Sequence, residues 1–150
     1  MKCPKCKKSE TRVIDSRLIE EGFSIRRRRE CPQCGYRFTT YEKINLDIMI
    51  IKKDGRREPY NREKLLIGIR KACHKRPISE EVIKKFINDL ELDLIQRGEN
   101  EIPSSYIGEK VMEALKDWDK VAYIRFASVY KEFKDVTEFI NQIKELGHDE

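Results

Sequence analysis

The sequence predicts an α+β protein in which a small four-cysteine β-module precedes a mainly helical domain capped by a short β-hairpin. Four cysteines lie within the first 34 residues. An Asp-Gly pair at 54–55 joins two extended runs, a pattern typical of a hairpin. Beyond residue 60, apolar side chains recur at helical spacing. We therefore expect one domain over residues 1–45, a second over 48–138, and a C-terminal helix end and tail over 139–150.

The four cysteines form two Cys-x-x-Cys pairs with residues 7–30 between them. The two-residue gap lets both thiolates of a pair reach one metal ion, and two pairs complete a closed tetrahedral shell. An iron site or a pair of disulfides is the alternative. No signal peptide precedes the first pair and Cys73 makes the cysteine count odd, which disfavours disulfides. The pattern predicts one structural zinc ion, held by Cys3, Cys6, Cys31 and Cys34.

The β-module contains short runs of β-branched and aromatic residues, separated by Glu21-Gly22 and by the cysteine turns. These runs predict strands at 13–14, 23–25 and 36–41. A sheet of this size buries too little apolar surface to fold alone. We therefore expect metal binding to supply its folding free energy.

The net charge of the 150-residue chain, +5, comes from its N-terminal third. Residues 1–47 hold 12 Lys and Arg against 7 Asp and Glu, whereas residues 48–150 hold 20 of each. A basic excess on a small module favours an anionic partner. Charged residues make up 39% and no long apolar run occurs, so the sequence predicts no membrane span and we expect a cytoplasmic protein.

Four consecutive arginines, Arg26–Arg29, lie on one predicted strand. Their mutual repulsion favours an anionic partner, and nucleic-acid phosphates are the usual one. Because side chains alternate along a strand, Arg27 and Arg29 share a face with Ile25 while the other two point away from it. The alternative is a solvated charged edge that resists aggregation. We predict a nucleic-acid contact through Arg26 and Arg28, extended by Arg12, Arg17 and Arg37.

The second domain is predicted to begin with an apolar run at 48–53 that turns at Asp54-Gly55 and returns through 56–58. The pattern then becomes helical, with Asn61 as N-cap of a first helix and Ser79 at the start of a second, which Gly98 ends. A third helix is predicted to begin near 103–105. The expected buried stripes are Leu65, Ile69 and Ala72, then Val82, Phe86, Leu90 and Leu94, then Ile107, Val111 and Leu115.

A fourth helix over 119–133 is apolar on nearly every side, so we expect it to lie centrally. Thr137 is predicted to cap a last amphipathic helix, which carries Phe139, Ile140, Ile143 and Leu146.

Two lysines on the hairpin and a third in the first turn of the following helix predict a phosphate cradle, because lysines and helix N-terminal amides both favour anions. An exposed charged hairpin beside an ordinary helix start is the alternative. The sequence has no G-x-x-x-x-G-K-[ST] loop, so a bound nucleotide is expected to be read rather than hydrolysed. The cradle comprises Lys52, Lys53, Glu58, Asn61 and Lys64; helical spacing alone favours core positions for Tyr123 and Tyr130.

Several segments of the sequence together resemble the pattern of one protein family. In the first domain these are MKCPKC at 1–6, VIDSR at 13–17, RRRREC at 26–31 and RFTTYE at 37–42. In the second they are IKKDG at 51–55, REPYN at 57–61, KL at 64–65, KRP at 75–77 and DKVAYIRFASVY at 119–130. Over about residues 1–146 the chain thus resembles the NrdR family, bacterial zinc-ribbon repressors of ribonucleotide reductase genes whose second domain is an ATP-cone. Lys53 and Tyr60 stand where many members have Arg and Phe.

The resemblance implies a homo-oligomeric transcriptional repressor, not an enzyme, whose zinc ribbon binds double-stranded DNA at operator boxes upstream of ribonucleotide reductase genes. It also implies that ATP and dATP are allosteric ligands of the ATP-cone and change its assembly state. The nucleotide-binding residues that carry over from the family are Ile51, Lys52, Lys53, Glu58, Asn61, Lys64, Leu65, Tyr123 and Tyr130.

Two other functions are compatible with parts of this pattern. The first is a zinc-ribbon module that interacts with the transcription machinery and does not read DNA sequence. A fragment of a reductase would also carry an ATP-cone, but the chain has no room for a catalytic barrel and no redox-cysteine set.

Overall fold

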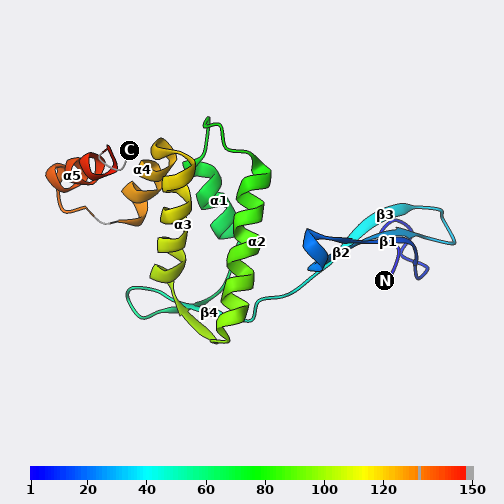
Figure 1. Ribbon diagram of the computed structural model, residues 1–150. Helices are drawn as coiled ribbons and strands as arrows, with labels where there is room; N and C mark the ends of the chain where they lie inside the picture. The colour runs from blue at the N-terminus through cyan, green and yellow to red at the C-terminus, as the bar shows by residue number, and fades with distance from the viewer. Residues whose placement is uncertain (132, 148–150) are drawn as a thin grey trace. The chain divides into compact units, whose positions relative to one another are not determined.

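The computed structural model describes residues 1–131 and 133–147, so the end of the expected tail, 148–150, lies outside the described residues. The chain divides into two compact units, Met1–Asn45 and Leu46–Glu150 (Figure 1). In the part of the chain that the structure describes, no helix is long and apolar enough to cross a membrane.

The first unit is a sheet of three antiparallel strands in the order β1-β2-β3, with a short 3-10 turn between the first two. All three predicted strands are present, but each is longer than the apolar run that predicts it, because polar residues continue the backbone pairing. Gly22 closes the turn with a φ of +94°, in agreement with the predicted break at Glu21-Gly22. The elements are β1 (Arg12–Ile19), η1 (Glu20–Gly22), β2 (Ser24–Glu30) and β3 (Arg37–Lys43).

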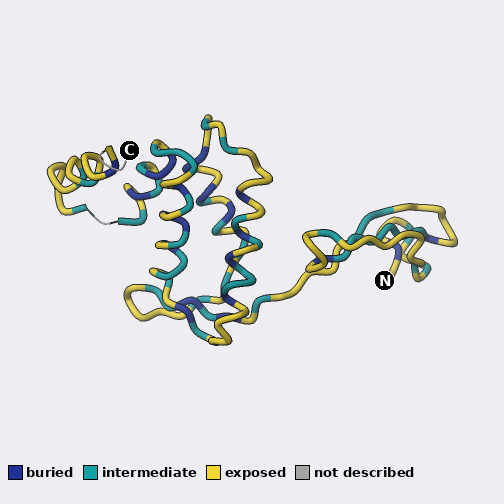
Figure 2. The backbone as a smooth tube through the Cα atoms, in the orientation of Figure 1, coloured by how far each residue is buried: buried dark blue, intermediate teal, exposed yellow. Residues whose placement is uncertain are grey.

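This first unit has almost no apolar core. Only Cys3, Ser24 and Cys31 are buried among its 45 residues, all of which the structure describes. Figure 2 shows the same contrast, with most of this unit exposed or half-buried and the buried segments gathered in the helical unit. A cross-link through the cysteines is therefore needed to hold the sheet together.

The second unit is a small sheet at one end of a helical bundle (Figure 1). The sheet has the order β5-β4-β6, in which β4 and β5 form an antiparallel hairpin and β6 runs parallel to β4. Its strands are β4 (Met49–Ile51), β5 (Arg57–Pro59) and β6 (Glu101–Pro103). Its helices are α1 (Arg62–Ala72), α2 (Glu80–Arg97), α3 (Ser104–Trp118), α4 (Lys120–Tyr130) and α5 (Val136–Gly147).

Strand β6 was not predicted from the sequence. The segment is too short to show an alternating pattern, and it is a strand because fully buried Ile102 pairs with Ile50 of β4. The predicted hairpin is confirmed. Its tip is closed by two backbone bonds, from the Lys52 N–H to the Arg56 carbonyl at 2.8 Å and from the Gly55 N–H to the Lys52 carbonyl at 2.9 Å.

The predicted caps of the first two helices are confirmed. The Asn61 side chain accepts a hydrogen bond from the Lys64 N–H at 3.2 Å, and Ser79 accepts one from the Val82 N–H at 3.3 Å. Gly98 ends α2 in the left-handed conformation, at φ +67°. The predicted last helix is present as α5, but its predicted cap is wrong: Thr137 lies inside the helix, and Asp135 accepts the Glu138 N–H at 2.9 Å instead.

Two of the predicted buried stripes are shifted by one residue near the start of their helices, whereas Ile69, Ala72, Leu90 and Leu94 are buried as predicted. In α2, Ile83 and Ile87 are buried, while Val82 is 42% exposed and Phe86 only packs against the core. In α1, Leu66 is buried and Leu65 is half-buried. Both helices carry adjacent apolar residues at these positions, so their spacing is compatible with either stripe and tertiary packing selects one.

The expectation that the fourth helix lies centrally is wrong. Helix α4 ends at Tyr130 rather than at 133, and Val121 and Val129 are 39% and 86% exposed. Ala122, Tyr123 and Ala127 form the buried face. The α4 segment therefore covers one side of the bundle.

Polar contacts fix α4 against the end of α1. Asp119, the N-cap of α4, accepts the Ala122 N–H at 2.9 Å and two bonds from the Arg76 Nε. These bonds hold the pKa of the Asp119 carboxyl below its usual range. The Arg125 guanidinium donates to the His74 carbonyl at 2.5 Å. Helix α5 is tied to α4 because Gln142 donates to the Tyr123 hydroxyl at 3.2 Å.

Candidate metal centre and binding surfaces

The four predicted cysteine ligands meet at one end of the first unit. Their sulfur atoms all lie within 4.8 Å of one another, with 3.6 Å between Cys3 and Cys34 and 3.7 Å between Cys6 and Cys31. A zinc ion with four Zn–S bonds of about 2.3 Å requires sulfurs about 3.8 Å apart at the corners of a tetrahedron. The cysteine cage therefore fits zinc, and no other group of metal-ligating side chains of this kind occurs among the described residues.

Backbone amides favour the ionised form of this cage. The Cys34 N–H faces the Cys31 sulfur at 3.5 Å and lowers the pKa of that thiol. Burial opposes ionisation of Cys3, but the N–H groups of Cys6 and Lys5 outweigh it and lower the pKa of Cys3 to about 6. The thiols of Cys3 and Cys31 are thus poised to bind a divalent cation as thiolates, whereas burial and hydrogen bonds with the other three thiols raise the pKa of Cys34 to about 11.

All five arginines of the predicted nucleic-acid patch lie on one face of the sheet. Arg26 is paired with Arg17 and Tyr41 across the strands, and Arg28 with Asp15 and Thr39. Directly paired residues of antiparallel strands point to the same face. We call this surface the basic face; its charged members are Arg12, Asp15, Arg17, Arg26, Arg28, Glu30, Arg37 and Lys43.

A β-bulge brings Arg12 onto the basic face. Arg12 and Arg17 are five positions apart and would point to opposite faces of a regular strand. The register shifts between Val13 and Asp15, so Arg12 pairs with Glu30 on the same face as Arg17. Glu30 accepts from Arg12 at 2.6 Å and from Arg37 at 2.7 Å, and these bonds lower the pKa of its carboxyl.

The opposite face of the sheet is less charged and more apolar. Arg27 forms an ion pair with Glu42 at 3.7 Å, and Arg29 donates to the Thr40 hydroxyl at 3.2 Å. Val13 and Leu18 share this face and are 43% and 71% exposed. The strand alternation inferred from the sequence thus separates two surfaces of different character.

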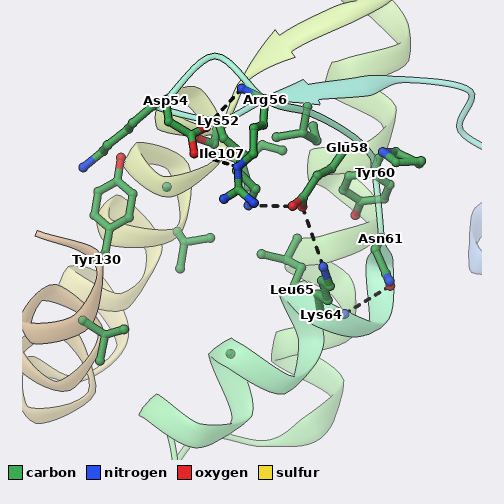
Figure 3. Close-up of a pocket in the computed structure, with 18 of the residues that line it drawn as sticks. Lys52, Asp54, Arg56, Glu58, Tyr60, Asn61, Lys64, Leu65, Ile107 and Tyr130 are labelled. Atoms are coloured by element: carbon green, nitrogen blue, oxygen red, sulfur yellow. Dashed lines mark hydrogen bonds and ion pairs between the residues drawn. The ribbon is translucent and has the colours of Figure 1, made fainter.

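A pocket of about 580 Å³ opens in the second unit, within the size range of small-molecule sites. Seven of the nine predicted nucleotide-binding residues line it, namely Lys52, Lys53, Glu58, Asn61, Lys64, Leu65 and Tyr130. Figure 3 shows that they come from the β4–β5 hairpin, the start of α1 and the end of α4. Elements far apart in the sequence therefore build one cavity.

Ile51 and Tyr123 do not line the pocket. Ile51 follows the pocket-lining Ile50 on β4, so the two side chains point to opposite faces of the strand. Tyr123 belongs to the buried core, where its hydroxyl accepts from Gln142.

Ion pairs occupy the polar side of the pocket. The Glu58 carboxylate lies between two lysines, 3.6 Å from Lys52 Nζ and 3.7 Å from Lys64 Nζ (Figure 3). Arg56 pairs with Asp54 at 2.6 Å. These cations exceed the carboxylates, and the first turn of α1 adds N–H donors, so the pocket suits an anion. Its other side is apolar, formed by Leu65, Ile107, Val111 and Phe126.

Side chains of α2 hold the start of α1 in place. Arg62 donates to both carboxylate oxygens of Glu91 at 2.9 Å and to Asn88 at 2.8 Å. The Tyr60 hydroxyl also donates to Glu91 at 3.0 Å, and burial raises the pKa of Tyr60. The cradle is therefore preorganised by α2.

The pocket residues of α3 and the apolar pocket residues of α4 were not predicted from the sequence. Ser104, Ile107, Gly108 and Val111 share one face of α3, and Phe126 precedes Tyr130 by one turn. Helical spacing identifies such a face, but it does not indicate which element the face meets.

Comparisons with known proteins agree with this two-part architecture. Residues 1–42 match the N-terminal domain of NrdR-like transcriptional repressors, and residues 48–136 match the ATP cone domain. The chain is 58% identical to a transcriptional repressor NrdR of Petrotoga mobilis over 97% of this chain and 98% of the relative. It is 54% identical to one of Syntrophotalea carbinolica over 97% and 94%, and 52% identical to one of Listeria welshimeri over 97% and 96%.

The chain belongs to the NrdR family of transcriptional repressors. Its cysteine cage is the structural zinc site of an NrdR zinc ribbon, and the pocket lies in its ATP cone domain. The expectation of an α+β protein with these two modules is confirmed.

Proposed function

We propose that this protein represses ribonucleotide reductase genes by binding operator DNA through the basic face and by sensing ATP and dATP through the pocket. The observation that carries the proposal is the presence, in one chain of the NrdR family, of a zinc ribbon with a basic face and an ATP-cone with a cationic pocket. Residues 1–45 then act as the DNA-binding domain and 48–138 as the nucleotide-binding domain. Such a protein acts in the bacterial cytoplasm, on the nucleoid.

The basic face fits the phosphate backbone of double-stranded DNA. Six cationic side chains share it with two carboxylates, whereas the opposite face has two arginines and one glutamate. One ribbon is small, so paired operator boxes require at least two ribbons presented by a homo-oligomer. The contacts that we assign to DNA are those of Arg12, Arg17, Arg26, Arg28 and Arg37.

Within the pocket, the phosphates of an adenine nucleotide would lie against Lys52, Lys64 and the first turn of α1. The Glu58 carboxylate lies 3.6 Å from the ammonium group of Lys52 and 3.7 Å from that of Lys64. The phosphates of a bound nucleotide would therefore compete with Glu58 for both lysines. Among the described residues the pocket holds no P-loop and no group of carboxylates suited to magnesium-assisted hydrolysis. We therefore propose that nucleotide is bound and released unchanged, and that the protein is not an enzyme.

The test of this function measures DNA affinity as a function of the bound nucleotide. Gel-shift titrations use a reductase promoter fragment and a scrambled fragment, each with ATP alone, dATP alone and both. The affinity for the promoter is expected to exceed that for the scrambled DNA and to differ between ATP and dATP. Equal affinity for both fragments under all conditions would favour an interaction module that does not read DNA.

The arginines of β2 provide a matched comparison within one strand. Replacing Arg26 or Arg28 by Ala is expected to flatten the slope of log affinity against log salt by about 0.9, because each removes one phosphate contact. Arg27→Ala and Arg29→Ala remove the same charge from the opposite face and are expected to change the slope less. Salt-dependent DNA titrations of the four variants measure this. Equal losses from all four would contradict the assignment of the basic face.

A further inference from the structure

Gly108 lies directly beneath the ring of Tyr130. A methyl group added at Gly108 would overlap the ring carbons of Tyr130 and lie 2.5 Å from its hydroxyl oxygen. Gly108 has no positive φ, so its backbone does not require glycine. A glycine inside a helix is less favourable than alanine, because it loses more backbone conformational freedom on folding. The space that it leaves for the ring is the compensating feature.

Tyr130 is held over Gly108 from three sides. Its hydroxyl donates to the Ser105 carbonyl at 3.3 Å, and its ring stacks on Phe126 with centroids 5.8 Å apart. The ammonium group of Lys53 lies over the ring, 5.4 Å from its centroid. In Figure 3 Tyr130 stands on the far side of the pocket from Glu58, Tyr60 and Asn61. The ring thus forms the α4 wall of the pocket and positions a hairpin lysine.

We propose that Gly108 is a positioning residue of the nucleotide pocket. By lacking a side chain it lets the Tyr130 ring lie against α3, where the ring closes the pocket and holds Lys53. This inference rests on the proposed binding of nucleotide. Tyr130 is the last residue of α4, so a methyl group at 108 displaces its ring without breaking the helix.

Gly68 offers a matched control on α1. It also lines the pocket and lies inside a helix, but a methyl group added there meets no atom within 4 Å. Gly68→Ala and Gly108→Ala are therefore the same substitution in the same pocket, and only the second disturbs Tyr130.

The experiment measures ATP and dATP binding by calorimetry for the full chain and four variants: Gly68→Ala, Gly108→Ala, Tyr130→Ala and the double variant Gly108→Ala/Tyr130→Ala. We expect Gly108→Ala to weaken binding at least tenfold while circular dichroism stays unchanged, and to weaken it more than Gly68→Ala does, because a methyl group at 68 meets no protein atom. In the Tyr130→Ala background, Gly108→Ala should have no further effect, because no ring remains to be displaced. If Gly108→Ala weakened nucleotide binding only by damaging the fold, it would weaken binding in the Tyr130→Ala background as well.

Three results would overturn the proposal. An unchanged nucleotide affinity of Gly108→Ala would show that nucleotide binding does not depend on the contact between the Tyr130 ring and α3. An equal loss in the presence and absence of Tyr130 would show that the methyl group acts on something else, such as the ligand. An unmodified chain that binds neither ATP nor dATP would refute the proposed function and this inference with it, whereas the first two results leave nucleotide binding intact.

Discussion

Replacing Cys31 by Ser is expected to abolish zinc binding, unfold residues 1–45 and eliminate DNA binding, while the helical unit stays folded. Cys31 is fully buried, and the first unit has no other apolar cluster to hold its strands together. Structural zinc sites contribute apparent binding free energies of about 10–16 kcal/mol, more than a sheet of this size can replace by packing. Metal analysis, circular dichroism and gel shifts measure the three effects.

Cys73→Ser is the control for this variant. Cys73 is buried in the core of the helical unit, where burial raises the pKa of its thiol, and it is absent from the cysteine cage. Its replacement should leave one zinc per chain and normal DNA binding. Retention of zinc by Cys31→Ser, or DNA binding that survives complete chelation, would contradict the structural role of the metal.

The sequence predicts the zinc centre well because its determinants are local. Each Cys-x-x-Cys turn fixes two ligands through short backbone contacts, such as the Cys6 N–H lying 3.5 Å from the Cys3 sulfur. The helix caps at Asn61 and Ser79 are predictable for the same reason, since each involves residues three positions apart.

Features that depend on distant contacts are not predictable from one sequence. Strand β6 exists only because Ile102 pairs with β4. The bulge that turns Arg12 onto the basic face contains no glycine, so the sequence does not indicate a bulge there. The contact between the Tyr130 ring and Gly108 joins residues of α4 and α3. The helical spacing of apolar residues does not indicate which two helices pack together. The sheet order of the second unit, and the part of its pocket formed by α3 and α4, are therefore known only from the structure.

Replacing Lys52 by Ala is expected to weaken nucleotide binding sharply and to make DNA affinity indifferent to dATP. Lys52 lines the pocket beside Glu58 and is 39% exposed, so its ammonium group is accessible to a phosphate. Loss of one charge-assisted contact costs about 2 kcal/mol, which corresponds to a roughly thirtyfold higher Kd. Zinc content and fold should not change, because Lys52 belongs to the exposed hairpin of the second unit.

The effect on DNA binding follows from linkage. Nucleotide changes DNA affinity only if it binds two assembly states with different affinity, and a variant that no longer binds nucleotide stays in the assembly that the empty cone prefers. Lys52 therefore influences DNA binding although the proposed DNA contacts lie in the other unit. Lys64→Ala should act in the same way, since its ammonium group pairs with the same Glu58 carboxylate.

Lys84 on α2 provides the matched control. It is exposed, carries the same charge and does not line the pocket. Lys84→Ala should keep the nucleotide affinity and the dATP response of the unmodified protein, which separates a local phosphate contact from a change in net charge. Calorimetry, gel-shift titration and sizing with ATP and dATP measure nucleotide affinity, DNA affinity and assembly state in parallel. A Lys52→Ala protein that no longer binds dATP, yet still changes its DNA affinity when dATP is added, would refute the coupling, as would steady phosphate release by the unmodified protein.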